Sequence, residues 1–295
     1  MNDRPHNGPS ARTLAQAADW GAWEVVCRLG PQDRSFEERH DFMSIAAVVG
    51  GTFEYRGATG RALLYPGSFL LGNAGACFEC GHSHGVGDRC IAFGFAPELF
   101  EEIAASAAGS SRYRFDRAML PVVPAMTPAL VDAEACAAMP DASVVEELAV
   151  SVAERVVRTL RGTPASRRAP SGRDGRRIAD VVRFIDAHCV EALDLATLAA
   201  RAHMSRYHFL RTFRHVVGMT PHRYVTHARL RWSAVRLRNS RAPIAEVAAD
   251  AGFGDLSTFH ARFRAAFGTT PGRMRNSTLT PPSSRTRGEG ARRAG

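Results

Sequence analysis

Lysine is absent from this 295-residue sequence, so all 38 basic side chains are arginine. Long apolar runs are absent as well, because no stretch approaches the roughly 20 consecutive apolar residues of a membrane-spanning helix. The first residues, MNDRPHNGPSARTLAQ, carry no apolar segment behind a basic start, so we expect neither a signal peptide nor a membrane anchor. We therefore expect a cytoplasmic protein. Six cysteines in a long chain without an export signal predict reduced thiols rather than a disulfide framework.

The charge is divided sharply along the chain. Residues 1–160 hold 13 Arg against 20 Asp and Glu, a net charge of −7, whereas residues 161–295 hold 25 Arg against 9 acidic residues, a net charge of +16. A compact basic half can bind a polyanion such as nucleic acid through counterion release. The alternative is a basic surface with no specific partner.

The charge boundary coincides with a change in composition. Residues 161–177, RGTPASRRAPSGRDGRR, are rich in Gly, Pro, Ser and Arg without apolar periodicity, which predicts an exposed linker. Upstream, from Phe42 to Phe95, short apolar runs broken by glycine predict a small antiparallel β barrel or sandwich. Apolar residues at helical spacing then predict helices over residues 97–108, 127–139 and 142–160. The whole is an α+β protein of two domains.

The last of these helices carries an apolar stripe that needs a partner. Its members recur at three- and four-residue intervals, as expected for one helical face. They are Val144, Val145, Leu148, Val152, Val156, Val157 and Leu160. The stripe is equally compatible with packing on the barrel of the same chain and with packing on the same helix of a second subunit.

The basic half contains an internal repeat. The stretch MSRYHFLRTFRHVVGMTP, residues 204–221, returns as residues 252–271, GFGDLSTFHARFRAAFGTTP, with Phe209, Phe213 and Gly218 shifted by 50 positions. The preceding LATLAARAHM matches IAEVAADAGF with a shift of 49, so the second turn should be one residue longer. A short helix, a tight turn and a longer basic helix therefore occur twice, which predicts two helix-turn-helix units.

Capping residues support the repeat. Ser205 and Asp255 can accept backbone N–H groups at the start of each second helix, and Gly218 and Gly268 suit the left-handed position at its end. Between the units, PHRYVTHARLRWSAVRLRNS predicts one long helix that fixes their separation. Recognition helices in successive major grooves must lie about 34 Å apart, and a rigid connector holds such a distance.

The segment from Ile178 to Arg275 resembles the C-terminal domain of AraC/XylS-type transcription regulators. The resemblance is strongest over RLRWSAVRLRNSRAPIAEVAADAGFGDLSTFHARFRAAFGTTPGRMR. A lone helix-turn-helix motif is weak evidence, but two in tandem with the connector and the closing phrase make the match specific. The resemblance implies a tandem helix-turn-helix domain over residues 178–276 that binds double-stranded promoter DNA as an activator or a repressor. Residues 277–295 are then a disordered tail.

The resemblance also assigns DNA contacts to exposed positions of each recognition helix. In the first helix these are Arg206, Tyr207, Leu210, Arg211 and Arg214, and in the second they are Leu256, Ser257, His260, Arg262 and Arg264. Arginine is the natural bidentate partner of guanine, so Arg211 and Arg206 are the strongest candidates for base reading, whereas Arg262 and Arg264 suit phosphates. Ala261 departs from the long polar side chain common there in the family. Each of these side chains has solvation as its alternative role.

The N-terminal half resembles the family's cupin-like sensor domain more faintly, in RHDFMSIAAVVGGTFEYRG, in LLYPGSFLLGNAG and in the helices that follow. This resemblance implies that residues 1–160 bind a small-molecule effector, form a homodimer, or do both, and it includes RNA polymerase among the partners. His40 and Asp41 are either pocket residues or the edge of a strand.

One cluster in this half has the composition of a metal site. CFECGHSHGVGDRC brings Cys77, Cys80, His82, His84 and Cys90 within 14 residues, and thiolates with imidazoles can complete a tetrahedral Zn²⁺ site. Cys77 and Cys80 would point to opposite faces of a strand, however, and the alternative is a turn whose cysteines are small buried apolar residues.

Three functions are compatible with these sequence features. The leading one is a DNA-binding regulator that answers a small-molecule effector, and the second is a regulator that senses metal or thiol redox state through the Cys77–Cys90 cluster. The third, a cupin-like oxygenase fused to a DNA-binding domain, lacks any acid/base or nucleophile constellation outside that cluster. We therefore expect no enzyme activity, and no cofactor apart from zinc in the second case.

Overall fold

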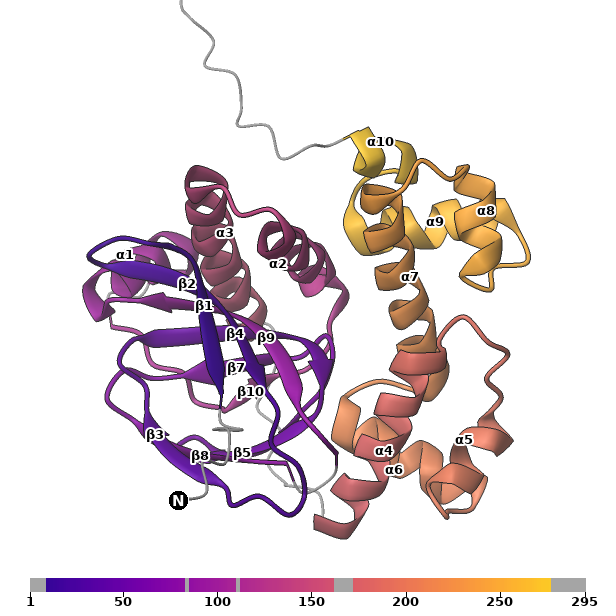
Figure 1. Cartoon of the computed structure of the whole chain (residues 1–295), viewed down its shortest axis with the longest axis horizontal. Helices are drawn as coiled ribbons and strands as arrows, with labels where there is room; N and C mark the ends of the chain where they lie inside the picture. The colour runs from indigo at the N-terminus through magenta and orange to yellow at the C-terminus, as the bar shows by residue number, and fades with distance from the viewer. Residues whose placement is uncertain (1–8, 83–84, 110–111, 162–171, 277–295) are drawn as a thin grey trace, which may run out of the picture.

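The computed structural model describes residues 9–82, 85–109, 112–161 and 172–276 (Figure 1). We call residues 9–161 the N-terminal half and residues 172–276 the C-terminal half. The N-terminal half combines β-sheets with helices, and the C-terminal half is all helical. Both halves therefore have the predicted fold class, α+β followed by all-α.

The strands of the N-terminal half form two antiparallel sheets. The larger sheet has the order β1-β2-β9-β4-β7-β10 and the smaller sheet has the order β3-β8-β5-β6. The strands are β1 Ser10–Gln16, β2 Trp20–Cys27, β3 Phe36–Arg39, β4 Met43–Gly51, β5 Phe53–Gly57, β6 Gly60–Leu64, β7 Phe69–Gly72, β8 Cys77–Gly81, β9 Asp88–Phe95 and β10 Met119–Leu120. Within the described ranges the sheets stay separate, so the expected closed barrel is wrong and the sandwich alternative is correct.

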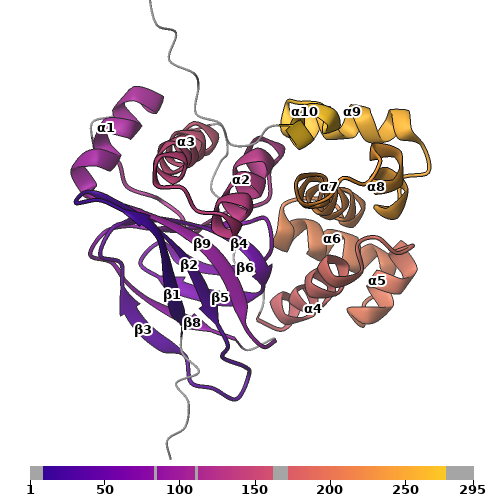
Figure 2. The same ribbon diagram turned by 45° about the horizontal axis from the view of Figure 1, so that its top comes forward.

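Alternation along the strands separates an inner from an outer face of the larger sheet. Val48 and Cys90 point inward and pack with Phe53, Tyr55 and other side chains of the smaller sheet. Their neighbours along the strands point outward into a second cluster, which the helices cover. Figure 2 shows these helices stacked above the larger sheet. They are α1 Pro97–Ala108, the short 3-10 helix η1 Pro124–Met126, α2 Thr127–Ala138 and α3 Ala142–Arg161.

The apolar stripe of α3 is buried within its own chain. Val145, Val152 and Val156 are fully buried in the cluster that α3 shares with the larger sheet, α1 and α2, and Val144 is half-buried at its edge. Of the two alternatives for this stripe, the structure shows the intrachain one.

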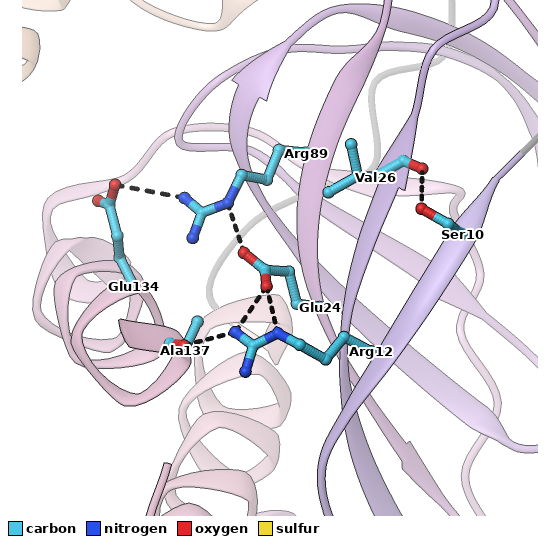
Figure 3. A network of polar contacts seen from close by, with 7 residues as sticks. All are labelled: Ser10, Arg12, Glu24, Val26, Arg89, Glu134 and Ala137. Carbon is cyan, nitrogen blue, oxygen red and sulfur yellow. Dashed lines mark hydrogen bonds and ion pairs between the residues drawn. The ribbon is translucent and has the colours of Figure 1, made fainter. Parts of the chain in front are cut away.

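Arginine pairs tie α2 to the outer face of the larger sheet (Figure 3). Glu24 on β2 accepts hydrogen bonds from Arg12 Nη2 at 2.6 Å and from Arg89 Nε at 2.8 Å. Arg12 also donates to the carbonyl of Ala137 at 2.6 Å, and Arg89 lies 3.6 Å from the carboxylate of Glu134. Burial opposes charge on Glu24, but the two guanidinium groups hold its pKa below the ordinary value. This network fixes α2, which in turn contacts the C-terminal half.

The C-terminal half begins earlier than the sequence predicted. Helix α4, Gly172–His188, starts inside the expected linker, so residues 172–177 are helical rather than linker, and Arg161 is the last residue of α3. Residues 162–171, the rest of the predicted linker, lie outside the described residues, as does the predicted tail, 277–295. The remaining helices are α5 Leu195–Arg201, α6 Arg206–Val217, α7 Pro221–Asn239, α8 Ile244–Asp250, α9 Leu256–Phe267 and α10 Pro271–Asn276.

Candidate nucleic-acid interface

The C-terminal half contains the two predicted helix-turn-helix units, α5–α6 and α8–α9, at opposite ends of α7 (Figure 1). Four residues separate α5 from α6 and five separate α8 from α9, so the second turn is one residue longer, as predicted. Both α5 and α8 lie on the side away from the β-sandwich in Figures 1 and 2. The repeat in sequence is therefore a repeat in structure.

The predicted caps are present at both ends of each recognition helix. Ser205 accepts from the backbone N–H of His208 at 3.3 Å, and Asp255 accepts from that of Thr258 at 2.7 Å. Gly218 and Gly268 end the helices with φ of 80° and 67°, in the left-handed region that glycine enters without penalty. Local sequence alone therefore fixes where α6 and α9 begin and end.

The turn between the helices uses a left-handed residue in both units. Gly252 takes this position in the second unit with φ of 76°, whereas His203 takes it in the first with φ of 51°. The hydrogen bonds match, because His203 donates to Ala200 and Gly252 donates to Ala249. His203 is the only described non-glycine residue with positive φ, so the first unit forms the same turn with a less suitable residue.

The phenylalanines of the recognition helices form the cores of the units. Phe209 and Phe213 of α6 are 0% exposed, and so are Phe259 and Phe263 of α9. Each pair packs ring against ring, at 5.5 Å and 5.4 Å between centroids. The arginines between the phenylalanines must therefore point outward, since the opposite helical face is occupied by the core.

The outward face of α6 is basic and aromatic. Arg206, Arg211 and Arg214 are exposed, Tyr207 is 76% exposed, and Leu210 is 36% exposed. An exposed tyrosine between arginines offers an apolar ring and a polar hydroxyl group to a binding partner. All five predicted contact residues of α6 thus lie on one solvent-facing side.

The outward face of α9 differs in composition. Leu256 is 43% exposed, Ser257 and Arg264 are also exposed, and His260 is half-buried with its ring 6.0 Å from that of Phe259. Arg262 is exposed too, but its Nη1 lies 3.4 Å from Thr226 Oγ1 on α7. All five predicted residues of α9 are therefore exposed or half-buried, and Arg262 also contacts the connector helix.

The connector helix α7 is tied to both units. Its 19 residues span about 28 Å at 1.5 Å per residue. Arg229 donates to the carbonyls of Cys189 and Glu191, at 2.7 Å each, and to that of Gly252 at 3.1 Å. One guanidinium group of α7 thus joins the segment that follows α4 to the turn of the second unit.

The N-terminal half packs against α6 and α7 through hydrogen bonds that the sequence did not predict. Tyr65 donates to the carbonyl of Val217 at 2.8 Å, and Tyr224 donates to that of Pro66 at 2.9 Å. Burial raises the pKa of both phenols, so both stay protonated donors. Arg238 near the end of α7 also binds Asp132 of α2 at 2.6 Å. Tyr65 lies in an apolar run and Tyr224 in the connector helix, and neither sequence indicates the hydrogen bond that the hydroxyl makes to the opposite half.

Among the described members of the predicted Cys/His cluster, Cys77, Cys80, His82 and Cys90 do not by themselves form a group of possible metal ligands. Cys77 is exposed, whereas Cys80 and Cys90 are buried in the core between the sheets, where burial raises the pKa of both thiols. His84 lies outside the described residues. His82 instead meets Cys27 and Asp88, which sequence reasoning missed. Cys27 and Asp88 are directly opposite each other in the β2–β9 pair, a register that the sequence alone does not reveal.

His40 is an interior residue of the sandwich. Its Nε2 lies 3.1 Å from the Tyr55 hydroxyl, and its ring stacks on Phe78 with centroids 4.2 Å apart. Burial outweighs the nearby charge of Asp41 and lowers the pKa of His40 to about 4. The imidazole is therefore neutral near pH 7.

The chain is similar to known proteins over part of its length. A family profile described as a helix-turn-helix domain matches residues 198–277. Regulatory protein SoxS of Escherichia coli is 33% identical over 99 residues, which cover 34% of this chain and 92% of SoxS. The right origin-binding protein of Escherichia coli is 34% identical over 100 residues, 34% of this chain and 35% of that protein.

Solved structures were found for the same region. The DNA-binding domain of AdpA, in complex with a target DNA, is 34% identical and aligns with a TM-score of 0.33 over 34% of this chain and 90% of that chain. An AraC-type DNA-binding domain-containing protein from Chromobacterium violaceum is 24% identical, with a TM-score of 0.33, over 34% of this chain and 89% of that one. In the part of the chain that the structure describes, no helix has the length and apolar character to span a membrane. By its similarity to SoxS over nearly the whole of that protein, the chain belongs to the AraC/XylS family of DNA-binding transcription regulators.

Proposed function

We propose that this regulator reads specific promoter sequences with α6 and α9 and responds to a small-molecule effector through its N-terminal half. The observation that carries the first part is the pair of recognition helices, each buried on its phenylalanine face and exposed on the other. One helix about 28 Å long, α7, connects the two units, and successive major grooves lie about 34 Å apart.

The contact residues divide by chemistry. Arg206 and Arg211 suit bidentate pairing with guanine, and Tyr207 suits a thymine methyl group or a phosphate. Leu210, Leu256, Ser257 and His260 offer apolar or single hydrogen-bond contacts to base edges. Arg214, Arg262 and Arg264 neutralise phosphates, which anchors the helices without selecting a sequence.

In this proposal residues 178–276 are the DNA-binding domain and residues 1–160 are the effector domain. The support for coupling between them is the interface at α6 and α7, where Tyr65 donates to the carbonyl of Val217 at the end of α6 and Tyr224 of α7 donates to the carbonyl of Pro66. A change in the sandwich would reach the helix that sets the spacing of α6 and α9. The further partners in the proposal are a second copy of the chain and RNA polymerase. The dimer needs a surface other than the α3 stripe, which is buried within the chain.

A DNA-binding titration with the full chain tests this proposal. Duplexes enriched from a genomic library serve as targets, and the dissociation constant is measured against salt concentration for wild type, Arg211→Ala and Arg114→Ala. Arg114 is exposed in the N-terminal half, so Arg114→Ala removes the same charge away from α6 and α9. The full chain is needed because Leu63, Tyr65 and Val122 share a core with the C-terminal half.

The expected result is affinity that falls by orders of magnitude as salt rises, as about 6–10 phosphate contacts require. Arg211→Ala should raise the dissociation constant for the enriched duplex and reduce the ratio between the affinities for enriched and scrambled DNA. Arg114→Ala should have the same dissociation constants as wild type. Equal losses in both variants, or no preference of wild type for the enriched duplex, would contradict the proposed function.

A further inference from the structure

Three side chains with metal-binding atoms meet at one end of the β-sandwich. Cys27 ends β2, Asp88 begins β9, and His82 directly follows β8. One ligand atom from each lies within 4.8 Å of the other two, and this is the one such group of three found in residues 9–82, 85–109, 112–161 and 172–276. The three residues come from both sheets, so their meeting depends on the tertiary fold.

The imidazole of His82 lies between the thiol and the carboxylate. Its Nδ1 is 3.9 Å from Cys27 Sγ, and its Nε2 is 2.5 Å from Asp88 Oδ2. All three side chains are nearly removed from solvent, since Cys27 is 5% exposed, His82 is 4% exposed and the Asp88 side chain is 8% exposed. A ligand held here would be bound inside the protein and not on its surface.

We propose that Cys27, His82 and Asp88 form a binding site for one divalent metal ion of the zinc class. A thiolate, an imidazole and a carboxylate are the donors that Zn²⁺ takes in proteins, and the thiol disfavours Mg²⁺ or Ca²⁺. In a tetrahedral zinc site neighbouring ligand atoms lie about 3.3–3.6 Å apart, given bonds of about 2.0–2.3 Å. The present separations reach 4.8 Å. Cys27 and Asp88 approach opposite nitrogens of the His82 ring, so binding of one metal ion requires the ring to turn until a single nitrogen faces the same point as the thiol and the carboxylate.

A second thiol lies beside this group. Cys90 Sγ is 3.4 Å from Asp88 Oδ1, the carboxylate oxygen that His82 does not contact. Cys90 follows Asp88 by two positions on β9, so both side chains point to the inner face of the larger sheet. Three protein ligands leave a fourth position in a tetrahedron, and Cys90, through its contact with Asp88, is a candidate for it.

A structural ion pair is the competing explanation for these residues. Burial opposes charge on His82, but hydrogen bonds to Asp88 and Cys27 and the charge of Asp88 raise the pKa of His82 to about 9. Without metal the imidazolium therefore pairs with Asp88 near pH 7. An ion pair of this kind requires no thiol, so the contribution of Cys27 separates the two explanations.

The proposed site lies next to the DNA-binding half. Gly85, which lies between His82 and Asp88 in the sequence, packs so closely on Arg183 of α4 that a β-carbon would lie 2.6 Å from Nη1. Arg183 also donates to Thr52 Oγ1 at 2.7 Å. A metal bound by His82 and Asp88 would hold these two residues in place on either side of Gly85 in the sequence, and so would stabilise the contact between Gly85 and α4.

Metal binding by the full chain tests the proposal without reference to DNA. Protein purified under reducing conditions is stripped with chelator, dialysed and titrated with Zn²⁺, and in parallel with Co²⁺, whose thiolate charge-transfer absorption reports a cysteine ligand. The variants are Cys27→Ser, His82→Gln and, as a matched control, Cys77→Ser. Cys77 is an exposed thiol of the same sandwich that lies outside the group.

The expected result is one metal ion per chain, with a thiolate band in wild type and in Cys77→Ser. Cys27→Ser and His82→Gln should each lower the affinity at least about 100-fold, because each removes one of three ligands. Melting curves of the metal-free proteins show whether each variant is folded, and Cys27→Ser, which changes one atom, keeps the test valid if His82→Gln unfolds. Wild type that binds no stoichiometric metal, or Cys27→Ser that binds as tightly as wild type, would overturn the proposal.

Discussion

The two helix-turn-helix units share their interiors and differ on their outward faces. Phe209 and Phe213 correspond to Phe259 and Phe263, and all four are fully buried. Fifty positions apart, the outward residues have changed chemistry. The pairs are Arg206 and Leu256, Tyr207 and Ser257, Leu210 and His260, and Arg211 and Ala261. The side chains of the buried face have to fill the same space in each unit. The side chains of the outward face are constrained only by the partner that they contact.

This difference makes the two recognition helices unequal in the proposed DNA complex. The first offers two guanidinium groups at base-reading positions, and each bidentate pair with guanine contributes about 1–3 kcal/mol of discrimination. The second offers an alanine and a leucine at the same positions and keeps only Arg264 in common with Arg214. We therefore infer that α6 supplies most of the sequence discrimination and that α9 contributes mainly to anchoring.

The largest effect should follow from removal of a core ring. Phe213→Ala and Phe263→Ala should each lower the free energy of unfolding by about 3–5 kcal/mol, because each ring is fully buried and leaves a cavity. Leu210→Ala, which truncates a side chain that is 36% exposed, is the control and should cost far less. Urea unfolding of the full chain measures all three. A much smaller loss in one phenylalanine variant would show that the cores are not equivalent.

Acid should destabilise both halves through buried histidines. Burial lowers the pKa of His40 to about 4, and burial with the nearby Arg231 and Arg223 lowers that of His227 to about 4. In the unfolded chain these imidazoles take up protons near pH 6.5, whereas in the folded protein they do so only near pH 4. Their contribution to the free energy of unfolding is therefore fully present above pH 6.5 and is lost as the pH falls toward 4. The loss is at most about 3 kcal/mol for each residue.

Unfolding measured between pH 7 and pH 4 checks this expectation. His40→Gln and His227→Gln should each flatten the pH dependence in that window, since glutamine does not titrate. Profiles that stay parallel to wild type would mean that neither imidazole is held neutral in the folded protein.

The next largest effect should be on recognition of DNA bases, and only substitutions in the first unit should produce it. Arg211→Ala should weaken binding to the preferred duplex by about 5- to 150-fold, or about 1–3 kcal/mol, and relax the preference at one base pair. The matched substitution in the second unit, Ala261→Ser, should leave affinity nearly unchanged. Equilibrium binding to single-base variants of the duplex distinguishes these outcomes. Lower affinity with unchanged specificity would make Arg211 a phosphate contact.

The smallest effect concerns the two turns. Gly252→Ala should cost about 1–2 kcal/mol, because alanine is strained at a φ of 76°. His203→Gly should change stability by less than about 0.5 kcal/mol, since the strain it relieves is offset by the greater freedom of glycine in the unfolded chain. Thermal unfolding of the two variants gives the comparison. A large loss in His203→Gly would reveal a contribution from the imidazole itself.

Local signals in the sequence predicted the DNA-binding half well. The 50-residue repeat located both units, and Ser205, Asp255, Gly218 and Gly268 were identified as caps because capping depends on neighbours along the chain. The sequence placed the start of the DNA-binding domain too late, at Ile178, whereas α4 begins at Gly172. The first six residues of α4, GRDGRR, contain no large apolar side chain, so no apolar periodicity indicated that they are helical.

The sandwich was predicted less completely. Strand β1 buries only two of its residues and β3 buries none, so neither gives a strong apolar run. Strand β2, WGAWEVVC, does carry apolar residues and could have been found, and its omission excluded Cys27 from the metal hypothesis. The pairing of Cys27 with Asp88 joins positions far apart in sequence and follows only from the register of β2 on β9. For the same reason, the separation into two sheets depended on pairings that local patterns do not encode.

Selection of bound sequences from a pool of random duplexes, with the full chain as bait, tests the central claim most directly. We expect a two-part motif whose centres lie about 10 base pairs apart, one helical turn. One part should be strongly constrained, contain guanine and lose that constraint in Arg211→Ala, while the other stays weakly constrained. No enriched motif, or a motif that is the same for wild type and Arg211→Ala, would contradict it.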